Sequence, residues 1–434
     1  MILGTPFFSI ICPLYNVENY IEKTIRSVID QNFCSLELLL VNDNSSDSTK
    51  DICDRLILED PRITLINLDN NFGPGYARNI GMEVARGEYL IFLDGDDYLA
   101  ENCLIQLLNE IKIENFPDMI HGAWSEIFGD IYSNQCTTEV TCNYDSDRFL
   151  QIYLKKRTYG FFCWEFIFKT NLIKINNVKF RNGKMGEDVD FVIKAIIRSG
   201  SILESNILFY IHRETLTGAL SSASGHFRHW KDLFISCVKI AELLQSKNLT
   251  LSERSWIELN VVMLLRQFED VVPLIEERFL REISAEMTLL KTYCSLFSYY
   301  AENDLVKKIK TENNAMESVR SYRIQKLNEI DVLIGDNKSK RIFICPANRS
   351  ATRLAMSLRS QKYCVAGLID NNESKKYLNF DGNNIFTANE ILEAFTHNRD
   401  YIIIYAATVS TQELIEKQLN GFGLCYMKDY SKRH

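Results

Sequence analysis

The sequence predicts an α/β protein of more than one domain, built on open sheets with helices on their faces. Apolar runs of strand length alternate with segments of helical period, first in residues 7–115 and again in residues 340–434. Such alternation is typical of parallel sheets, because the crossover between two parallel strands needs a helix. The chain of 434 residues, 46% of them hydrophobic, is also too long for one ordinary core.

The first alternation predicts four parallel strands. Each apolar run is followed by polar or turn residues and then by a segment with one apolar stripe, so strand and helix follow one another regularly. Strands are expected at residues 8–13, 36–41, 63–68 and 89–93, and helices at 20–30, 48–58 and 75–85.

The rest of the chain divides into three stretches. Residues 118–221 are mixed, with strands around Ile120 and Leu208 and a helix at 187–198. Residues 226–333 are helical in pattern, and residues 340–434 alternate again, with strands at 341–345, 365–369 and 401–406 and helices at 351–361, 388–395 and 411–419. The expected domains are therefore 1–222, a helical connector or bundle at 223–335, and a small Rossmann-like domain at 336–434.

The last domain lacks the glycine fingerprint of dinucleotide-binding folds. Residues 341–350 stand where Gly-x-Gly-x-x-Gly would lie between strand and helix, yet this segment contains no glycine. Without glycine the backbone cannot easily approach a pyrophosphate, so we expect no dinucleotide there despite Asp370 after the next strand. An acceptor, partner or dimerisation module is the expectation, and the oligomeric state stays open.

Charge and cysteine content narrow the partners and the compartment. With 49 basic and 57 acidic residues the net charge is −8, which argues against nucleic acid as a main partner. Twelve cysteines are scattered without a Cys-x-x-Cys pair, which favours reduced thiols and a cytoplasmic location. No leader pattern or apolar run of about 20 residues is present, so a soluble or peripherally attached protein is expected.

An acidic cluster follows the fourth predicted strand. Asp94, Asp96 and Asp97 come directly after the apolar run 89–93, at the carboxyl end where open α/β sheets bind ligands. Side chains two residues apart in extended chain point the same way, so Asp94 and Asp96 can converge on one ion. Carboxylates without nearby Cys or His suit Mg²⁺ or Mn²⁺. A solvated Asp-Gly turn is the alternative for this segment taken alone.

Four segments in this order resemble the motifs of family 2 glycosyltransferases, which have the GT-A fold of nucleotide-diphospho-sugar transferases. All but the glycine-rich one follow a predicted strand, so their side chains should meet along one rim of the sheet. The segments are residues 9–18 (SIICPLYNVE), 41–47 (VNDNSSD), 71–79 (NFGPGYARN) and 87–98 (GEYLIFLDGDDY).

The resemblance implies a nucleotide site and a metal site at this rim. Asp43 would accept a hydrogen bond from the imide of uracil, which a carboxylate can do, and Arg78 would lie near the base or diphosphate. Asp96 would hold Mn²⁺ or Mg²⁺, with Asp94 on the metal or the ribose and His212 as a further ligand. The alternatives are a turn at 42–47 and a surface position for Arg78. The nucleoside pocket would be lined by Pro13, Tyr15 and Asn16, and Glu18 would help to order it.

The resemblance also implies an acid pair that acts on the acceptor. Asp188 would take the proton of the attacking hydroxyl while Glu187 positions the acceptor; an N-cap of the following helix is the alternative for Asp188. Asp97 would order its loop or contact the acceptor. Trp164 would form a stacking wall for the acceptor sugar, although Glu165 departs from the family pattern and a core tryptophan is an equal alternative.

These expectations combine into one function. The chain is expected to be an inverting, metal-dependent glycosyltransferase that moves a sugar from a nucleotide donor, UDP-linked, to a hydroxyl of a glycan or glycolipid in surface polysaccharide synthesis. A non-catalytic nucleotide-sugar binding subunit of a larger assembly is the alternative. The basic residues at 155–157 could touch an anionic membrane that carries a lipid-linked acceptor, or form an ordinary solvated turn.

Overall fold

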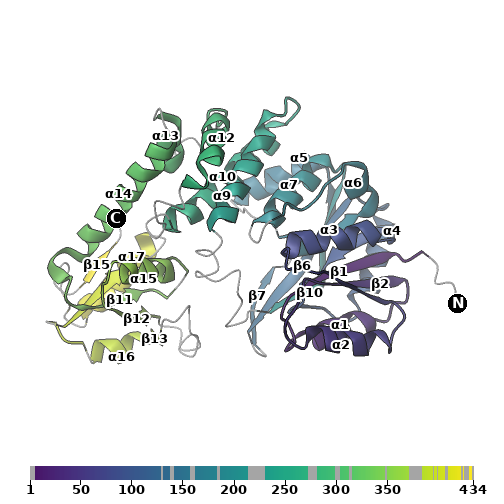
Figure 1. Cartoon of the computed structure of the whole chain (residues 1–434), viewed down its shortest axis with the longest axis horizontal. Coiled ribbons are helices and arrows are strands. Elements are labelled where there is room, and N and C mark those ends of the chain that lie inside the picture. The colour runs from purple at the N-terminus through teal and green to yellow at the C-terminus, as the bar shows by residue number, and fades with distance from the viewer. Residues whose placement is uncertain are drawn as a thin grey trace. The chain divides into compact units, whose positions relative to one another are not determined.

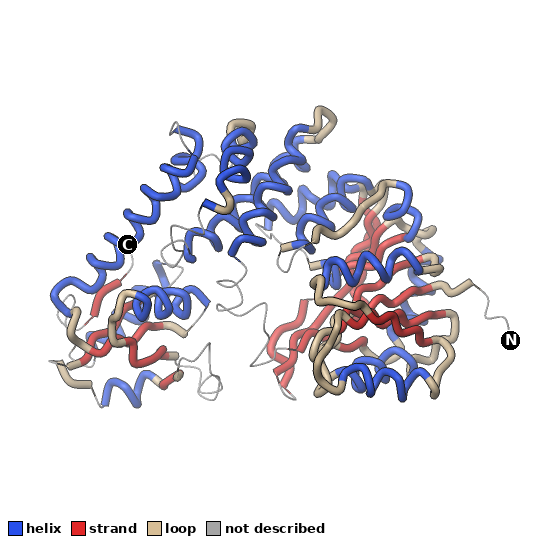
Figure 2. Tube along the Cα trace, in the orientation of Figure 1, coloured by secondary structure: helices blue, strands red, loops and turns tan. Residues whose placement is uncertain are grey.

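The structure is a computed structural model of the whole chain, shown as a ribbon in Figure 1 and as a tube in Figure 2. It describes residues 5–128, 131–136, 141–156, 162–182, 186–213, 230–271, 281–298, 304–311, 315–347, 349–370, 384–393, 395–397, 399–405, 409–421, 424 and 430–432.

The chain forms two compact units. The first comprises Met1–Thr215 and Lys239–Val261, and the second comprises Leu216–Val238 and Val262–His434. The three-domain boundaries at residues 222 and 335 stay a prediction. Each unit contains one sheet, so each is described by itself.

The sheet of the first unit begins with the four predicted parallel strands. They are β1 (Phe8–Leu14), β2 (Leu36–Asn42), β3 (Ile63–Asn67) and β4 (Tyr89–Phe92). Their order is β3-β2-β1-β4, with Ile10 opposite Leu38 on one side and Ile91 on the other. Because β1 lies in the middle, the chain runs outward from it in both directions, and such a change of direction is where open α/β sheets bind ligands.

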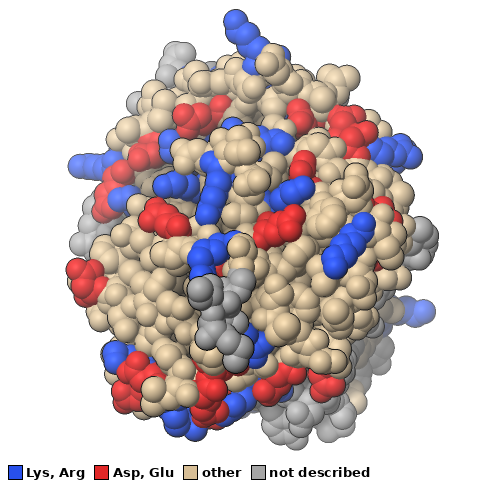
Figure 3. All heavy atoms as spheres, turned by 90° about the vertical axis from the view of Figure 1, so that its right-hand side faces the viewer, with Lys and Arg blue, Asp and Glu red and all other residues tan. Residues whose placement is uncertain are grey.

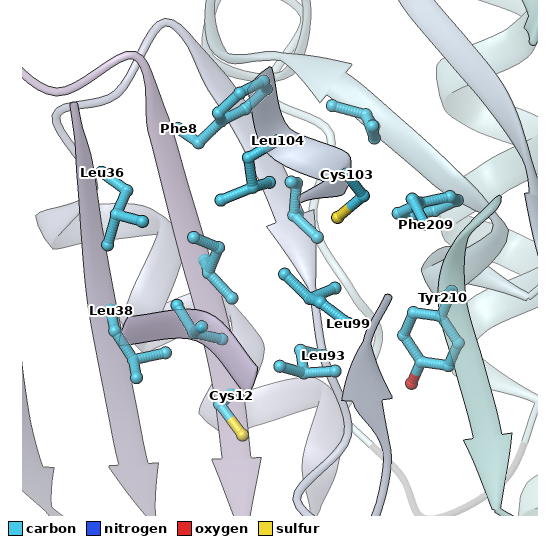
Figure 4. Packing of buried hydrophobic residues seen from close by; sticks show 14 of the residues in the cluster. Phe8, Cys12, Leu36, Leu38, Leu93, Leu99, Cys103, Leu104, Phe209 and Tyr210 are labelled. Atoms are coloured by element: carbon cyan, nitrogen blue, oxygen red, sulfur yellow. The ribbon is translucent and has the colours of Figure 1, made fainter. Parts of the chain in front are cut away.

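Helices cover both faces of this parallel part. Figure 1 shows α1 and α2 on one face of the sheet and α3 on the other. The apolar faces of the strands and of α4 form a common core that includes Cys12, Leu93, Leu104, Phe209 and Tyr210 (Figure 4). The helices are α1 (Ile21–Ile29), α2 (Thr49–Ile57), α3 (Pro74–Val84) and α4 (Cys103–Ile113).

Beyond β4 the sheet becomes mixed. β9 (Phe166–Lys169) runs antiparallel to both β4 and β6, which was not predicted, and β6 is parallel to β10. The order continues β4-β9-β6-β10-β5, with β7 on β6 and β8 on β10. The remaining elements of this part are β5 (Tyr98–Leu99), β6 (Met119–Phe128), β7 (Ile131–Cys136), β8 (Cys142–Tyr144), β10 (Ile202–Arg213), α5 (Ser146–Lys156), the 3-10 turn η1 (Cys163–Glu165), α6 (Thr170–Ile175) and α7 (Glu187–Arg198).

A helical stretch follows, as the sequence predicts. Among the described residues, no helix combines the length and the hydropathy needed to cross a bilayer. The helices are α9 (Trp230–Glu242), α10 (Leu251–Val271), α12 (Ser284–Cys294), α13 (Asp304–Thr311) and α14 (Ala315–Ile334).

The second unit ends in a parallel sheet of order β13-β12-β11-β14-β15, which confirms the Rossmann-like arrangement. β11 (Arg341–Cys345) and β12 (Val365–Ile369) begin and end where predicted. Apolar clusters fill both faces of the sheet, one around Ile344 and Tyr401 and the other around Phe343 and Ile402. The other elements are β13 (Ile385–Phe386), β14 (Asp400–Ile404), β15 (Tyr430–Lys432), α15 (Arg349–Ser360), α16 (Ala388–Glu393) and α17 (Val409–Gly421).

Candidate active site

The loops after β1 and β2 are tied together by hydrogen bonds. Asn16, in a left-handed conformation at φ 54°, accepts a bond from the backbone N–H of Ser46 at 2.8 Å. The Glu18 carboxylate accepts one from the N–H of Ser48 at 2.9 Å. Pro13 is buried in β1, whereas the Tyr15 side chain is 51% exposed. Tyr15, Asn16 and Glu18 are all exposed, and the hydrogen bonds of Asn16 and Glu18 shape the loop around Tyr15.

Asp43 joins the end of β2 to the glycine-rich segment. Its two carboxylate oxygens accept the backbone N–H groups of Phe72 and Gly73, both at 2.8 Å, and the residue is 2% exposed. Gly73 has φ 93°, a conformation that favours glycine, and α3 begins at the next residue. Uracil recognition by Asp43 stays a prediction, and it would use lone pairs beyond the two that already accept backbone donors.

Arg78 stands at the centre of an acid cluster. On α3, it is buried and donates from Nη2 to Asp94 at 2.7 Å and from Nη1 to Glu187 at 3.0 Å and Asp188 at 2.8 Å. Gly75, one turn earlier, makes this approach feasible: a Cβ there would lie 2.6 Å from the Arg181 carbonyl. One guanidinium thus joins the acid after β4 to the acid pair of α7, which is 93 or more residues away in sequence.

The acid pair begins α7 but does not cap it. The helix starts at Glu187 after Gly186 at φ 72°, so the N-cap alternative for Asp188 is wrong. Burial raises the pKa of both carboxyls, while Arg78 opposes the shift. The buried thiol of Cys163 also hydrogen-bonds Asp188. A carboxylate with a raised pKa is better matched to accepting a hydroxyl proton near neutral pH.

Asp97 is fully buried and organises the loop after β4. Its carboxylate accepts the Tyr210 hydroxyl at 2.6 Å and the Arg213 backbone N–H at 2.7 Å, and it lies 3.1 Å from His212 Nδ1. Tyr210 also accepts the backbone N–H of Asp94. Burial opposes a charge on His212, but the hydrogen bond and the negative charge of Asp97, together with the charges of Glu126 and Asp94, outweigh it and raise the pKa to about 9. Asp97 therefore orders its loop and is neutralised by a protonated imidazole.

Asp96 is the carboxylate of this loop that fits a cation. Burial, followed by repulsion from Asp97 and Asp94, raises its pKa to about 7. A cation would relieve the repulsion among these carboxylates. Because their donors are oxygens, Mg²⁺ or Mn²⁺ suits them. Among the described residues, however, no three Asp, Glu, His or Cys side chains are arranged as a complete metal cage. Asp96 would hold the ion with oxygens of the donor, and His212 would join only after losing its proton.

The tryptophan predicted to face the acceptor lies inside an aromatic stack. Trp164 is 5% exposed and parallel to Phe162, with ring centroids 5.3 Å apart, and to Tyr210 at 4.7 Å. Glu165 turns inward, with its carboxylate 3.8 Å from buried His121. Phe162, 48% exposed, is the member of the stack that is most open to solvent.

Sequence reasoning missed Tyr210 and Cys163 as parts of this site. Tyr210 belongs to the apolar core, and its hydroxyl points toward the carboxyl ends of the strands (Figure 4). An aromatic residue in an apolar strand gives no signal of such a role. Cys163 precedes Trp164, but its contact with Asp188 depends on how η1 packs against α7. The basic segment at 155–157 cannot be followed beyond exposed Lys155, because the Lys156 side chain and Arg157 lie outside the described residues.

Known structures share the fold of this chain. The crystal structure of S. aureus TarS 1-349 in complex with UDP-GlcNAc superposes with a TM-score of 0.54 at 19% identity, over 74% of this chain and 92% of that one. At this identity the likeness establishes the fold. The parallel strands, joined to a mixed part of the sheet, have the GT-A fold.

Residues 9–173 match the model of glycosyl transferase family 2. An uncharacterized glycosyltransferase of Haemophilus influenzae is 39% identical over 31% of this chain and 52% of its own length. GlyG of Streptococcus pneumoniae is 27% identical over 47% and 70%, and the minor teichoic acid biosynthesis protein GgaB of Bacillus subtilis is 30% identical over 51% and 25%. The match thus spans about half the length of the first relative. The recognition from sequence motifs is confirmed.

Proposed function

We propose that the protein is an inverting, metal-dependent glycosyltransferase that moves a sugar from a UDP donor to a hydroxyl of a glycan or glycolipid acceptor in surface polysaccharide synthesis. One observation carries the proposal: Arg78 contacts Asp94, on the donor loop, and Asp188, the candidate base, at the same time. Both ends of a single displacement would therefore lie within one cluster.

In this reaction Asp188 accepts the proton of the acceptor hydroxyl as its oxygen attacks the anomeric carbon. The bond from that carbon to the diphosphate oxygen breaks on the opposite face, so the configuration inverts and UDP leaves. Glu187 orients the acceptor beside Asp188. A divalent ion held by Asp96 would neutralise the charge that grows on the diphosphate.

The nucleotide side rests on Tyr15 and the loops that Asn16 and Glu18 fasten. An exposed aromatic ring beside ordered backbone offers a stacking surface for a base. The relative solved with UDP-GlcNAc supports a uridine donor, and the teichoic acid relative supports an acceptor in a surface polymer. The proposed location is the cytoplasm or the inner face of the membrane.

The test is a thermal-shift screen of nucleoside diphosphates with and without Mn²⁺, followed by single-turnover release of UDP from a UDP-sugar by the purified chain. UDP should raise the melting temperature only when the metal is present, because a ligand that binds the native state stabilises it. Binding without any UDP release would contradict the proposal and favour the non-catalytic binding subunit.

A further inference from the structure

We propose that Arg78 is a positioning residue that holds Asp94, Glu187 and Asp188 at fixed spacing, and that it does not bind the nucleotide. The inference deepens the proposed function and rests on it. It replaces the role that the sequence suggests for Arg78, a contact with the base or the diphosphate.

The hydrogen bonds and the burial of the Arg78 guanidinium support this role. Both terminal nitrogens already bind carboxylates at 2.7–3.0 Å, and the side chain is 4% exposed. The buried Nε has no hydrogen-bond partner among the described residues. The ring of Phe180 lies beneath the guanidinium, with 5.3 Å between Cζ and the ring centroid. Three of the five N–H donors are used, and the others belong to a side chain that is 4% exposed, so a diphosphate could reach them only if the packed carboxylates moved aside, which costs the compensation of a buried charge.

The geometry of the contacts also requires arginine. The planar guanidinium offers separate donors in a fixed fork, so Nη2 can face the loop after β4 while Nη1 faces the start of α7. A lysine ammonium is a single point on a flexible stem and cannot hold both sides at this spacing. The side chains it joins differ in access, since Asp94 is 29% and Asp188 15% exposed. Ligands therefore reach the carboxylates and not the arginine.

Arg78→Lys is the decisive variant. We expect UDP release to fall at least about tenfold, as for other positioning groups in an active site, while the metal-dependent Kd for UDP stays within about twofold. Arg86→Lys is the matched control, because Arg86 binds Glu37 through Nε and Nη2 at the opposite end of the strands and is 63% exposed. The control should leave both quantities unchanged. If Arg78→Lys weakens UDP binding as much as it slows turnover, Arg78 is a nucleotide ligand and the inference is overturned.

A double-mutant cycle separates this inference from the proposed function. If Arg78 acts through Asp188, then Arg78→Lys should add little to Asp188→Asn, because residues that act as a unit are non-additive. If the effects of the two substitutions multiply instead, the positioning role is overturned and the proposed function stays intact. Wild-type turnover by Asp188→Asn alone would refute the proposed function, and the inference with it.

Stability gives a second readout that needs no substrate. Arg78→Met removes the counter-charge of three carboxylates, so the melting temperature should fall by several degrees. Adding Glu187→Gln and Asp188→Asn should restore much of the loss, because the remaining charges no longer repel. A triple variant that melts no higher than Arg78→Met would contradict the inference even if the single variant folds poorly.

Discussion

The parallel strands β3-β2-β1-β4 of the first unit and β13-β12-β11-β14 of the second share an order but differ at their carboxyl edges. In the first unit, Asp43, Asp94 and Asp97 follow strand ends and are held by backbone donors, Arg78 and Tyr210. In the second, the described residues after the corresponding strands are Pro346, Asp370 and Tyr405. Among these, Asp370 is the one charged side chain. A sheet edge therefore provides a place for a site, but the acids and their partners determine whether chemistry follows.

The largest expected effect is at Asp188, the candidate base beside the carboxyl edge of the first sheet. Asp188→Asn should lower turnover on the order of 10²–10⁴-fold, because the amide cannot accept the hydroxyl proton. Single-turnover UDP release measures the loss, and binding of UDP with Mn²⁺ should persist as proof that the site is folded. Retained turnover would remove the functional contrast between the two edges.

The hydrogen bonds that hold Asp94 and Asp97 can be tested through Tyr210. Tyr210→Phe deletes the hydroxyl that donates to Asp97 and accepts from Asp94, and leaves buried groups without a partner. The free energy of unfolding should fall by about 1–3 kcal/mol, measured by urea denaturation. Tyr401→Phe, which removes a hydroxyl bonded to the Leu333 carbonyl in the second unit, is the comparison variant. A larger loss of unfolding free energy in Tyr401→Phe than in Tyr210→Phe would show that the carboxyl edge of the first sheet is no better supported.

The pH dependence of metal binding follows from Asp96. Its pKa is raised to about 7, so the ionised fraction increases as pH rises from 6 to 8. Since a cation binds the ionised form, Mn²⁺ affinity in the presence of UDP should increase about tenfold over this range. Calorimetric titration of wild type and Asp96→Asn checks this. An affinity that stays flat in the wild type would exclude Asp96 as the ligand.

Without metal, the stability of the folded protein should fall as the pH rises, whereas Mn²⁺ affinity should increase. A carboxyl with a raised pKa binds its proton more tightly in the folded state, so its contribution is complete below the unfolded pKa and is lost as pH rises through about 7. As the pH rises from the unfolded pKa to about 7, the melting temperature of the metal-free protein should therefore decline less in Asp96→Asn than in the wild type.

The smallest effect is expected at the other edge. Asp370→Asn should change the free energy of unfolding by no more than about 0.5 kcal/mol and leave UDP release unchanged. Thermal melting and the single-turnover assay measure both. A large loss of turnover would mean that the second sheet takes part in the reaction.

Local pattern predicted much of the fold and the location of the site. The bounds of β11, β12 and α7 agree with the expectation, and the motif acids do lie at the strand ends. The antiparallel β9 escaped prediction because an apolar run does not reveal its direction. The partners of Arg78 escaped it for a different reason: they are set by the packing of α3 against residues 109 and 110 positions further along.

On the surface, basic and acidic side chains are interspersed over the face of the first unit in Figure 3. This agrees with the modest net charge of −8. Inside the site, by contrast, three carboxylates surround the one guanidinium of Arg78.

Position 75 limits how this enzyme could be redesigned. A methyl group there would meet the Arg181 carbonyl at 2.6 Å and the Glu187 side chain at 3.0 Å. Alanine, the mildest substitution, would push the start of α7, which carries Glu187 and Asp188, away from α3. A library that randomises the start of α3 should therefore return active clones with glycine alone at this codon.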